Sequence, residues 1–265
     1  MDYTAEAWAT LRRLREIAPL VHNITNYVAM DVSANALLAI GAAPAMVHAL
    51  EEVEAFVAIS HALVVNIGTL SPPWVEAMRR AADRAVQLGK PWVLDPVGAG
   101  ATKYRTQTAR ELAGRHPTVI RGNASEILAV GGGVEGTRGV DSAHGSDDAL
   151  AAARGLARRL GCVVAVTGAV DYVTDGRRTL SVSNGHPMMT RVTALGCSAT
   201  ALTGAFLAAH DDPVFASAAA LAVLGLAGEL AARDAAGPGT FRQHLLDALY
   251  AMDEAALAGA RIAEA

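Results

Sequence analysis

Short apolar runs alternate with longer segments of helical periodicity along most of the chain. The runs are rich in Val, Ile and Leu without polar alternation, which is typical of strands buried on both faces of a parallel sheet. The predicted strands are Leu20–Ile24, Ala45–Val47, Ala62–Ile67, Trp92–Asp95, Val119–Gly122 and Val163–Thr167. The predicted helices between them include Asn26–Ile40, Val53–Ser60, Pro72–Leu88 and Asp147–Leu160, the last ending at Gly161. The alternation predicts an α/β fold with a mostly parallel sheet covered by helices.

Three segments depart from this rhythm. The first 20 residues predict an amphipathic helix without the apolar core of a signal peptide. The segment Asp171–Asn184 carries an Asp-Gly turn between apolar runs, which predicts a hairpin added antiparallel at one edge of the sheet. From Gly196 the pattern is helical almost to the end, with a break at residues 237–239. With no repeat, linker or low-complexity tail, residues 1–265 are predicted to form a single domain.

Composition and charge exclude several classes of protein. Acidic and basic residues are interspersed at a formal net charge of -4, so no basic surface indicates nucleic-acid binding. No uninterrupted apolar run reaches the ~18 residues of a membrane span. The two cysteines, Cys162 and Cys197, are far apart and lack metal or redox spacing, which favours a reducing cytoplasm. Cys162 is expected to be a small core residue.

Polar side chains gather where the apolar runs end, the edge at which parallel sheets bind ligands. Asn26 follows the first run, and capping of the next helix is the simpler explanation for it. Asp95 ends the fourth run and is followed by Gly98 and Gly100, a pattern that suits a substrate or metal site as well as a purely geometric turn.

The next two strand ends carry residues suited to a nucleotide. Asn123 and Glu126 are spaced for an ordinary capping box, or for Glu126 to hold water on a hard cation such as Mg²⁺. Arg121 lies just upstream and has the chemistry to reach phosphate oxygens. Thr167 ends the sixth run, where its hydroxyl suits either a phosphate contact or a turn cap.

The stretch "VTALGCSATALTGAF" begins the long helical part of the chain. Gly196-Cys197-Ser198 at a helix start offers free N–H groups and the positive end of the helix dipole, an anion site. The small residues that follow indicate tight packing against the sheet, which does not account for the leading glycine and cysteine.

The motifs "HNITNYVAMD", "DPVGAGATKYR", "RGNASEI", "VTG" and "GCSAT" occur in the order found in hydroxyethylthiazole kinases, and the chain resembles that family from about Pro19 to its C-terminal helices. The resemblance implies a ribokinase-like three-layer α/β/α fold. It also implies phosphorylation of 4-methyl-5-(2-hydroxyethyl)thiazole by ATP with Mg²⁺, in a homotrimer whose active sites lie at subunit junctions.

The resemblance also implies roles for individual residues. The catalytic corner is Cys197, where related kinases carry an aspartate, with Gly196 in the anion hole. The remaining roles are substrate contacts by Asn26, Met46 and Ala194, ATP contacts by Arg121, Thr167 and Asn123, and the Mg²⁺ side of the site at Asp95 and Glu126. His22 and His48 flank this pocket and are more often structural than ligand-binding.

The chain departs from the family at "VTALGC", where members usually read "VTG[TAS]GC". The methyl group of Ala194 is expected to shift the substrate fit, and the side chain of Leu195 to narrow access to the pocket.

Cys197 is expected to orient the substrate hydroxyl and accept its proton late, while the anion hole supplies more of the rate. A helix N-terminus favours a low thiol pKa, whereas ATP phosphates and Asp95 oppose it.

The alternatives to a hydroxyethylthiazole kinase are a hydroxymethylpyrimidine-type kinase, an ATP-dependent dehydratase of hydrated nicotinamide nucleotides on the same fold, and a nucleotide sensor without catalysis.

Overall fold

The computed structural model describes residues 2–132 and 145–265. They form a nine-stranded sheet in the order β2-β1-β3-β4-β5-β6-β7-β8-β9. The strands are β1 (Leu20–Ile24), β2 (Ala43–Met46), β3 (Ala62–Asn66), β4 (Trp92–Asp95), β5 (Val119–Asn123), β6 (Val163–Thr167), β7 (Asp171–Thr174), β8 (Thr179–Val182) and β9 (Ile262–Glu264). Strands from β2 to β6 pair in parallel, and the pairs from β6 to β9 are antiparallel.

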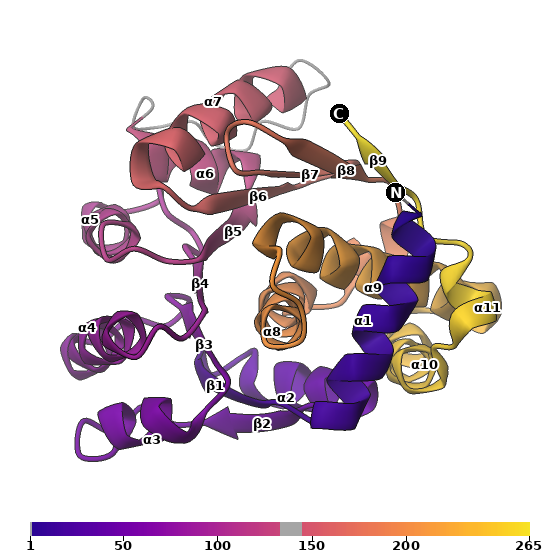
Figure 1. Ribbon diagram of the computed structural model, residues 1–265, viewed down its shortest axis with the longest axis horizontal. Coiled ribbons are helices and arrows are strands. Elements are labelled where there is room, and N and C mark those ends of the chain that lie inside the picture. The colour runs from indigo at the N-terminus through magenta and orange to yellow at the C-terminus, as the bar shows by residue number, and fades with distance from the viewer. Residues whose placement is uncertain (1, 133–144) are drawn as a thin grey trace.

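Helices cover both faces of the sheet (Figure 1), so the predicted three-layer α/β/α architecture is confirmed. One face carries α3 (Val53–Ile59), α4 (Pro72–Gln87), α5 (Lys103–Ala113), α6 (Ala124–Gly131) and α7 (Gly145–Leu160). The other carries α1 (Tyr3–Ile17), α2 (Met30–Ile40), α8 (Leu195–Leu207), α9 (Pro213–Asp234), α10 (Pro238–Ala251) and α11 (Glu254–Leu257), with a 3₁₀ turn at Pro187–Arg191.

Helices α8 and α9 form the buried centre of the second layer. Helix α9 is long and apolar enough to span a membrane by length and composition, but 89% of its most apolar window is buried inside the fold. Helix α8 approaches the sheet closely at Gly204, where an added Cβ would lie 2.7 Å from Cγ2 of Val64 on β3. This close approach accounts for the small residues in the sequence of α8.

Most predicted elements are confirmed, and their differences from prediction have local causes. Strand β2 begins at Ala43, two residues before the predicted start, because Pro44 is tolerated at the edge of a sheet, where no ladder donor is needed. Helix α2 begins at Met30 rather than Asn26, because the Asn26 side chain accepts the N–H of Ala29 and closes a separate turn first.

The predicted hairpin is β7 and β8, but it does not form the edge of the sheet. The last residues, for which no element was predicted, form β9, which pairs antiparallel with β8 from Val182 to Leu180. Three-residue strands carry too little periodicity to be seen in a sequence.

The strand order reverses at β1, which has β2 on one side and β3 on the other. Helix α2 follows β1 on one face, and α3 follows β2 on the opposite face (Figure 1). Such a switch point leaves a crevice beyond the carboxyl ends of the two central strands. The residues that end β1 and β3 are therefore placed to bind a ligand.

Candidate active site

The carboxyl ends of four parallel strands bring most of the predicted residues together. Asn26 follows β1, Asp95 ends β4, Asn123 ends β5 and Thr167 ends β6. The start of α8, in the second layer of helices, lies beside these strand ends. Arg121 on β5 donates to the carbonyl of Gly196 in the first turn of α8 over 3.0 Å. The site thus joins strand ends from the middle of the sheet to the first turn of one helix.

The start of α8 supplies unpaired donors one residue earlier than predicted. Ala194 is the N-cap residue, and its carbonyl already accepts the N–H of Ser198 over 2.9 Å. The N–H groups left without an acceptor inside the helix are therefore those of Leu195, Gly196 and Cys197. These three N–H groups, with the positive end of the helix dipole, have the geometry that the predicted anion hole requires.

A chain of side-chain hydrogen bonds runs across the site. Nδ2 of Asn26 donates to Sγ of Cys197 over 3.4 Å and to Oδ1 of Asn66 over 2.9 Å. Nδ2 of Asn66 donates to Oδ2 of Asp95 over 2.7 Å, and Oγ1 of Thr200 donates to the same oxygen over 2.7 Å. The thiol and the carboxylate are therefore held by one connected amide network.

Asp95 is 1% exposed and is the most strongly perturbed acid of the site. Burial raises its pKa to about 7, and the neighbouring Glu126 carboxylate adds to the increase. The Arg121 guanidinium and the hydrogen bonds from Thr200 and Asn66 act in the opposite direction. Its Oδ1 is buried and has no hydrogen-bond partner among the described residues, which leaves one oxygen free for a ligand.

Cys197 is a neutral thiol at physiological pH. Burial raises its pKa to about 11, and the Asp95 charge adds to the increase, while hydrogen bonds from Asn26 and Asn66 and the Arg121 charge lower it. Asp95 opposes ionisation of this thiol as expected, and burial, which was not among the expected influences, is the larger cause of the raised pKa. The sulfur therefore begins as a hydrogen-bonding group and not as a base.

Arg121 is 9% exposed and links the two sides of the predicted phosphate site. Besides the Gly196 carbonyl, it donates from Nη2 to Oγ1 of Thr167 over 2.8 Å. Its Nε is buried without a partner among residues 2–132 and 145–265. A buried guanidinium with a remaining donor beside a helix N-terminus suits an anionic ligand.

The capping interpretation of Asn123 and Glu126 is confirmed. Oδ1 of Asn123 accepts the N–H of Glu126 over 3.0 Å, and Oε2 of Glu126 accepts the N–H of Asn123 over 2.9 Å. Oε1 of Glu126 accepts the N–H of Gly98 over 2.8 Å, which ties the glycine loop after β4 to α6. Each carboxylate oxygen keeps a second lone pair for water or a cation.

The carboxylates of Asp95 and Glu126 fit a hydrated magnesium ion. One Asp95 oxygen is buried and has no partner in the described part of the chain, and burial, with a contribution from the Glu126 charge, raises the pKa of Asp95. The described residues contain no cluster of three or more His, Cys, Asp or Glu side chains that would enclose a metal by themselves. Mg²⁺ commonly takes only one or two carboxylates and completes its shell with water and substrate phosphates.

The expected obstruction by Leu195 is wrong. Leu195 is 6% exposed and packs in the core between the sheet and the second layer of helices, because its position in the first turn of α8 directs it inward. Ala194 is the unusual residue, with φ 65 in the left-handed region that favours glycine. The departure from the family pattern therefore places strain in the backbone beside the anion hole.

Three other predicted residues lie at the margin of the site or in the core. Met46 is half-buried at the end of the edge strand β2, opposite Asn23 of β1. His22 is fully buried, its Nε2 bonded to the Val47 carbonyl over 2.7 Å, and burial lowers its pKa to about 4, as for a core histidine. Cys162 is 7% exposed, as expected of a core thiol.

Sequence reasoning missed Asn66 and Thr200. Asn66 ends β3, but the predicted run extended to Ile67 and so placed Asn66 inside the strand. Thr200 follows Gly196 by one helical turn in the "GCSAT" motif, so both lie on one side of α8. A polar residue at every strand end, including the third, is the signal that would have found Asn66.

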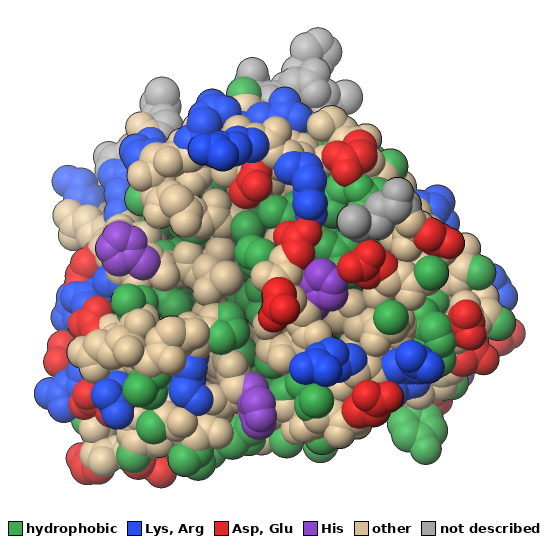
Figure 2. All heavy atoms as spheres, viewed as in Figure 1, with side chains coloured by type: hydrophobic (Ala, Val, Ile, Leu, Met, Phe, Trp, Pro, Cys, Tyr) green, Lys and Arg blue, Asp and Glu red, His purple; other side chains and the backbone are tan. Residues whose placement is uncertain are grey.

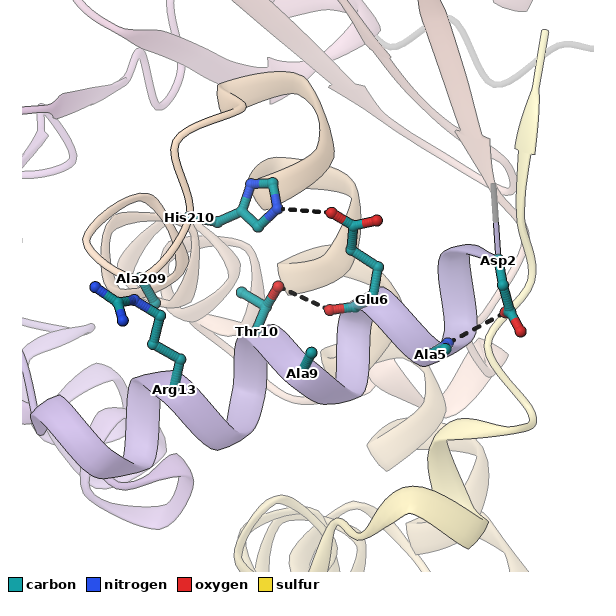
Figure 3. A pocket seen from close by; sticks show the side chains of 8 residues that line it. All are labelled: Asp2, Ala5, Glu6, Ala9, Thr10, Arg13, Ala209 and His210. Atoms are coloured by element: carbon teal, nitrogen blue, oxygen red, sulfur yellow. Dashed lines mark hydrogen bonds and ion pairs between the residues drawn. The ribbon is translucent and has the colours of Figure 1, made fainter.

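A pocket of about 370 Å³ lies away from this site, between α1 and the segment that follows α8 (Figure 3). Nε2 of His210 and Oε1 of Glu6 are 3.0 Å apart across it, and Thr10 donates to the Glu6 carbonyl over 2.8 Å. It contains none of the predicted site residues. The face of the molecule in Figure 2 carries acidic and basic side chains intermixed, without a continuous basic stripe.

The family model that matches the chain is the Hydroxyethylthiazole kinase family, over residues 11–255. The chain belongs to the hydroxyethylthiazole kinase family. Hydroxyethylthiazole kinase of Granulibacter bethesdensis is 57% identical over 257 residues, covering 95% of this chain and 94% of its own length. That of Syntrophus aciditrophicus is 54% identical, covering 96% and 95%. The predicted family resemblance is confirmed.

Solved structures agree with the family. The hydroxyethylthiazole kinase of Pyrococcus horikoshii superposes with a TM-score of 0.92 at 46% identity, covering 98% of this chain and 99% of that one. A pyridoxal kinase of Bacillus subtilis superposes with a TM-score of 0.60 at 20% identity, covering 79% and 91%. The second likeness shows the shared ribokinase-like fold, and the first shows how closely this chain follows the hydroxyethylthiazole kinases.

Proposed function

We propose that this chain transfers the γ-phosphoryl group of ATP to the primary alcohol of 4-methyl-5-(2-hydroxyethyl)thiazole in thiamine biosynthesis or salvage. One observation carries the proposal. The free N–H groups of α8 lie beside Arg121 and Asp95 at the carboxyl ends of the parallel strands. Phosphoryl transfer depends mainly on positioning and charge stabilisation, and this edge supplies both.

Arg121, Thr167 and Asn123 hold the ATP phosphates in this proposal. The remaining Arg121 donors and the Thr167 hydroxyl lie next to the start of α8, so the transferred group meets the N–H groups of residues 195–197. Charge that grows on the phosphoryl oxygens in the transition state is stabilised there without reorganisation of water. Bound Mg²⁺, held by Asp95 and Glu126 through water, would neutralise part of the phosphate charge.

The substrate alcohol binds beside Asn26, Ala194 and Cys197, with Met46 lining the thiazole ring. Because the Cys197 thiol is protonated at neutral pH, its sulfur orients the hydroxyl by accepting a hydrogen bond. Proton acceptance by sulfur is restricted to the thiolate fraction, on the order of 10⁻⁴ at pH 7 for a pKa of about 11. The proton therefore leaves the hydroxyl late, as its oxygen bonds to the transferred phosphorus and ADP departs, and it passes to the thiolate fraction of Cys197. The anion hole provides most of the acceleration.

The assembly and the cellular setting extend the same proposal. We infer one domain over residues 1–265, a homotrimer with active sites at subunit junctions, and action in the cytoplasm. The continuous nine-stranded sheet supports a single domain. Tyr27 and Val28, directly after Asn26, are 68% and 57% exposed, which supports a junction beside the site.

One assay tests the proposed activity against its rivals. ATP consumption is measured with the thiazole alcohol, with hydroxymethylpyrimidine, with hydrated NADH and with no acceptor. Turnover above the acceptor-free rate is expected with the thiazole alcohol and not with the other two. Absence of turnover with the thiazole alcohol overturns the proposal, and ATP binding without turnover in any mixture favours a nucleotide sensor.

A further inference from the structure

Asn66 lies at the centre of the hydrogen-bond network although it contacts none of the groups proposed to hold phosphate. It is 1% exposed at the end of β3, next to the switch point of the sheet. Its Oδ1 accepts from Nδ2 of Asn26 and from the N–H of Gly68, each over 2.9 Å. Its Nδ2 donates to Asp95 over 2.7 Å. These hydrogen bonds of the Asn66 side chain therefore all hold other protein groups in place.

The chemistry of its neighbours allows this amide only one orientation. The Gly68 N–H can only donate, so the Asn66 atom that faces it must be the oxygen, and the Asn66 nitrogen is left to donate to Asp95. The Asn66 oxygen in turn requires a donor from Asn26 and therefore directs the Asn26 nitrogen toward Asn66 and Cys197. The Asn26 oxygen is left to accept the Ala29 N–H over 3.0 Å.

The loop after β3 holds Asn26 from a second side. A Cβ on Gly68 would lie 2.5 Å from Nδ2 and 2.7 Å from Cβ of Asn26, so only glycine fits there. Arg105 fixes this loop by donating to the carbonyls of Ile67 over 2.5 Å and Gly68 over 3.1 Å. It also donates to the Val97 carbonyl over 3.0 Å, which joins the loops after β3 and β4.

We propose that Asn66 is a positioning residue. Its amide holds Asn26, and through Asn26 the Cys197 sulfur, at a fixed position relative to the Asp95 carboxylate. This inference rests on the proposed kinase function for its kinetic consequence. Misplacement of a reacting group by about 1 Å can cost ~10²-fold in rate. The Asn66 amide holds both the Asp95 carboxylate and, through Asn26, the Cys197 sulfur.

The Asp95 half of the network is tested by Asn66→Asp. The substitution keeps the oxygen that faces Asn26 and Gly68 but places a second carboxylate against Asp95. We expect kcat to fall by at least ~10²-fold, with KM for ATP changed by no more than about twofold, because the proposed phosphate contacts are untouched. Retention of kcat within about threefold overturns the proposal.

Asn184→Asp is the matched control. Asn184 is also buried, its Nδ2 donates to Glu229 over 3.3 Å, and its Oδ1 accepts the N–H of Arg261 over 2.7 Å, so its side chain bonds to none of the proposed site residues. The control is expected to lower the Tm while leaving kcat per folded enzyme unchanged. An equal loss of kcat in Asn184→Asp would reduce Asn66 to a structural role and overturn the proposal.

The Asn26 half is tested by Gly68→Ala in the wild type and in an Asn26→Gly background, which removes the Asn26 Cβ as well as its amide, with Gly155→Ala, which points into open space, as a control. Gly68→Ala is expected to lower the Tm by roughly 3–10 °C and to reduce kcat only where Asn26 is present. Equal Tm losses in both backgrounds overturn the proposal. The Tm cycle needs no substrate, so it judges the positioning even if the wild type fails to phosphorylate the thiazole alcohol.

Discussion

Nδ2 of Asn26 donates a hydrogen bond to Sγ of Cys197 over 3.4 Å, across 171 positions of the chain. A donor to sulfur favours the thiolate, and the Arg121 charge acts in the same direction. Burial and the Asp95 carboxylate nevertheless raise the pKa of the thiol to about 11. Cys197 is therefore available to orient a hydroxyl at neutral pH and is poorly suited to deprotonate one.

The reactivity of Cys197 should follow this raised pKa. Only the thiolate is alkylated, so the rate with iodoacetamide is expected to rise about tenfold per pH unit from pH 7 to pH 9.5 without a plateau. Mass spectrometry of the labelled peptide measures the rate, and Cys197→Ala reports the background from buried Cys162, whose pKa is about 12. A plateau near pH 8 would contradict the raised pKa.

Substitution of Cys197 separates orientation from proton transfer. Cys197→Asp supplies an acceptor whose ordinary pKa, about 3.9, is far below that of a thiol, and it is expected to match or exceed the wild-type kcat. Cys197→Ala removes the oriented contact and is expected to lose about 10²-fold in kcat, at the low end for an acid–base group. Steady-state kinetics at saturating ATP measure both. If Cys197→Asp loses as much as Cys197→Ala, late proton acceptance at this position is wrong.

Glu126→Gln separates the metal role of Glu126 from its capping role. Glutamine at the third helical position preserves a capping box, so the Tm is expected to change little. Loss of the charge should weaken the Mg²⁺ dependence of the reaction, seen as a higher Mg²⁺ concentration for half-maximal rate. Asn123→Ala, which removes the reciprocal cap, is the comparison expected to lower the Tm. An unchanged Mg²⁺ response in Glu126→Gln removes that residue from the metal site.

Ala194→Gly should relieve backbone strain at the start of α8. Ala194 has φ 65, where a Cβ costs about 1–2 kcal/mol, part of which the greater freedom of an unfolded glycine offsets. We expect unfolding in urea to become less favourable by about 1 kcal/mol. Ala208→Gly at the other end of α8, with a helical φ of -74, should instead destabilise the protein. Destabilisation by Ala194→Gly would show that the strain is compensated locally.

Gly204→Ala tests the close packing of α8 on the sheet. The added methyl would lie 2.7 Å from Cγ2 of Val64 and 3.4 Å from Cγ1 of Val21, so a loss of ~1–3 kcal/mol in unfolding free energy is expected. Gly155→Ala in α7 faces open space and should gain up to ~1 kcal/mol from helix propensity. Chemical denaturation of both variants measures the contrast, and a neutral Gly204→Ala would contradict such tight packing.

The local pattern of the chain predicted much of the fold and the placement of the site. The runs that became β1, β4 and β6 were predicted to the residue, because strands buried on both faces require continuous apolar side chains. Their ends located Asn26, Asp95 and Thr167 because the carboxyl ends of parallel strands share one edge. The reciprocal cap of Asn123 and Glu126 could also be predicted from the sequence, because a capping box involves only four consecutive residues.

What the sequence alone determined is the order of strands and helices and the polar residues at their ends, since both follow from short-range periodicity. Only the tertiary structure decided that Leu195 turns into the core, that Asn66 joins Asn26 to Asp95, and that the Cys197 thiol stays protonated. These properties depend on desolvation and on distances between groups far apart in the chain. Neither quantity exists until the helices of the second layer close over the sheet.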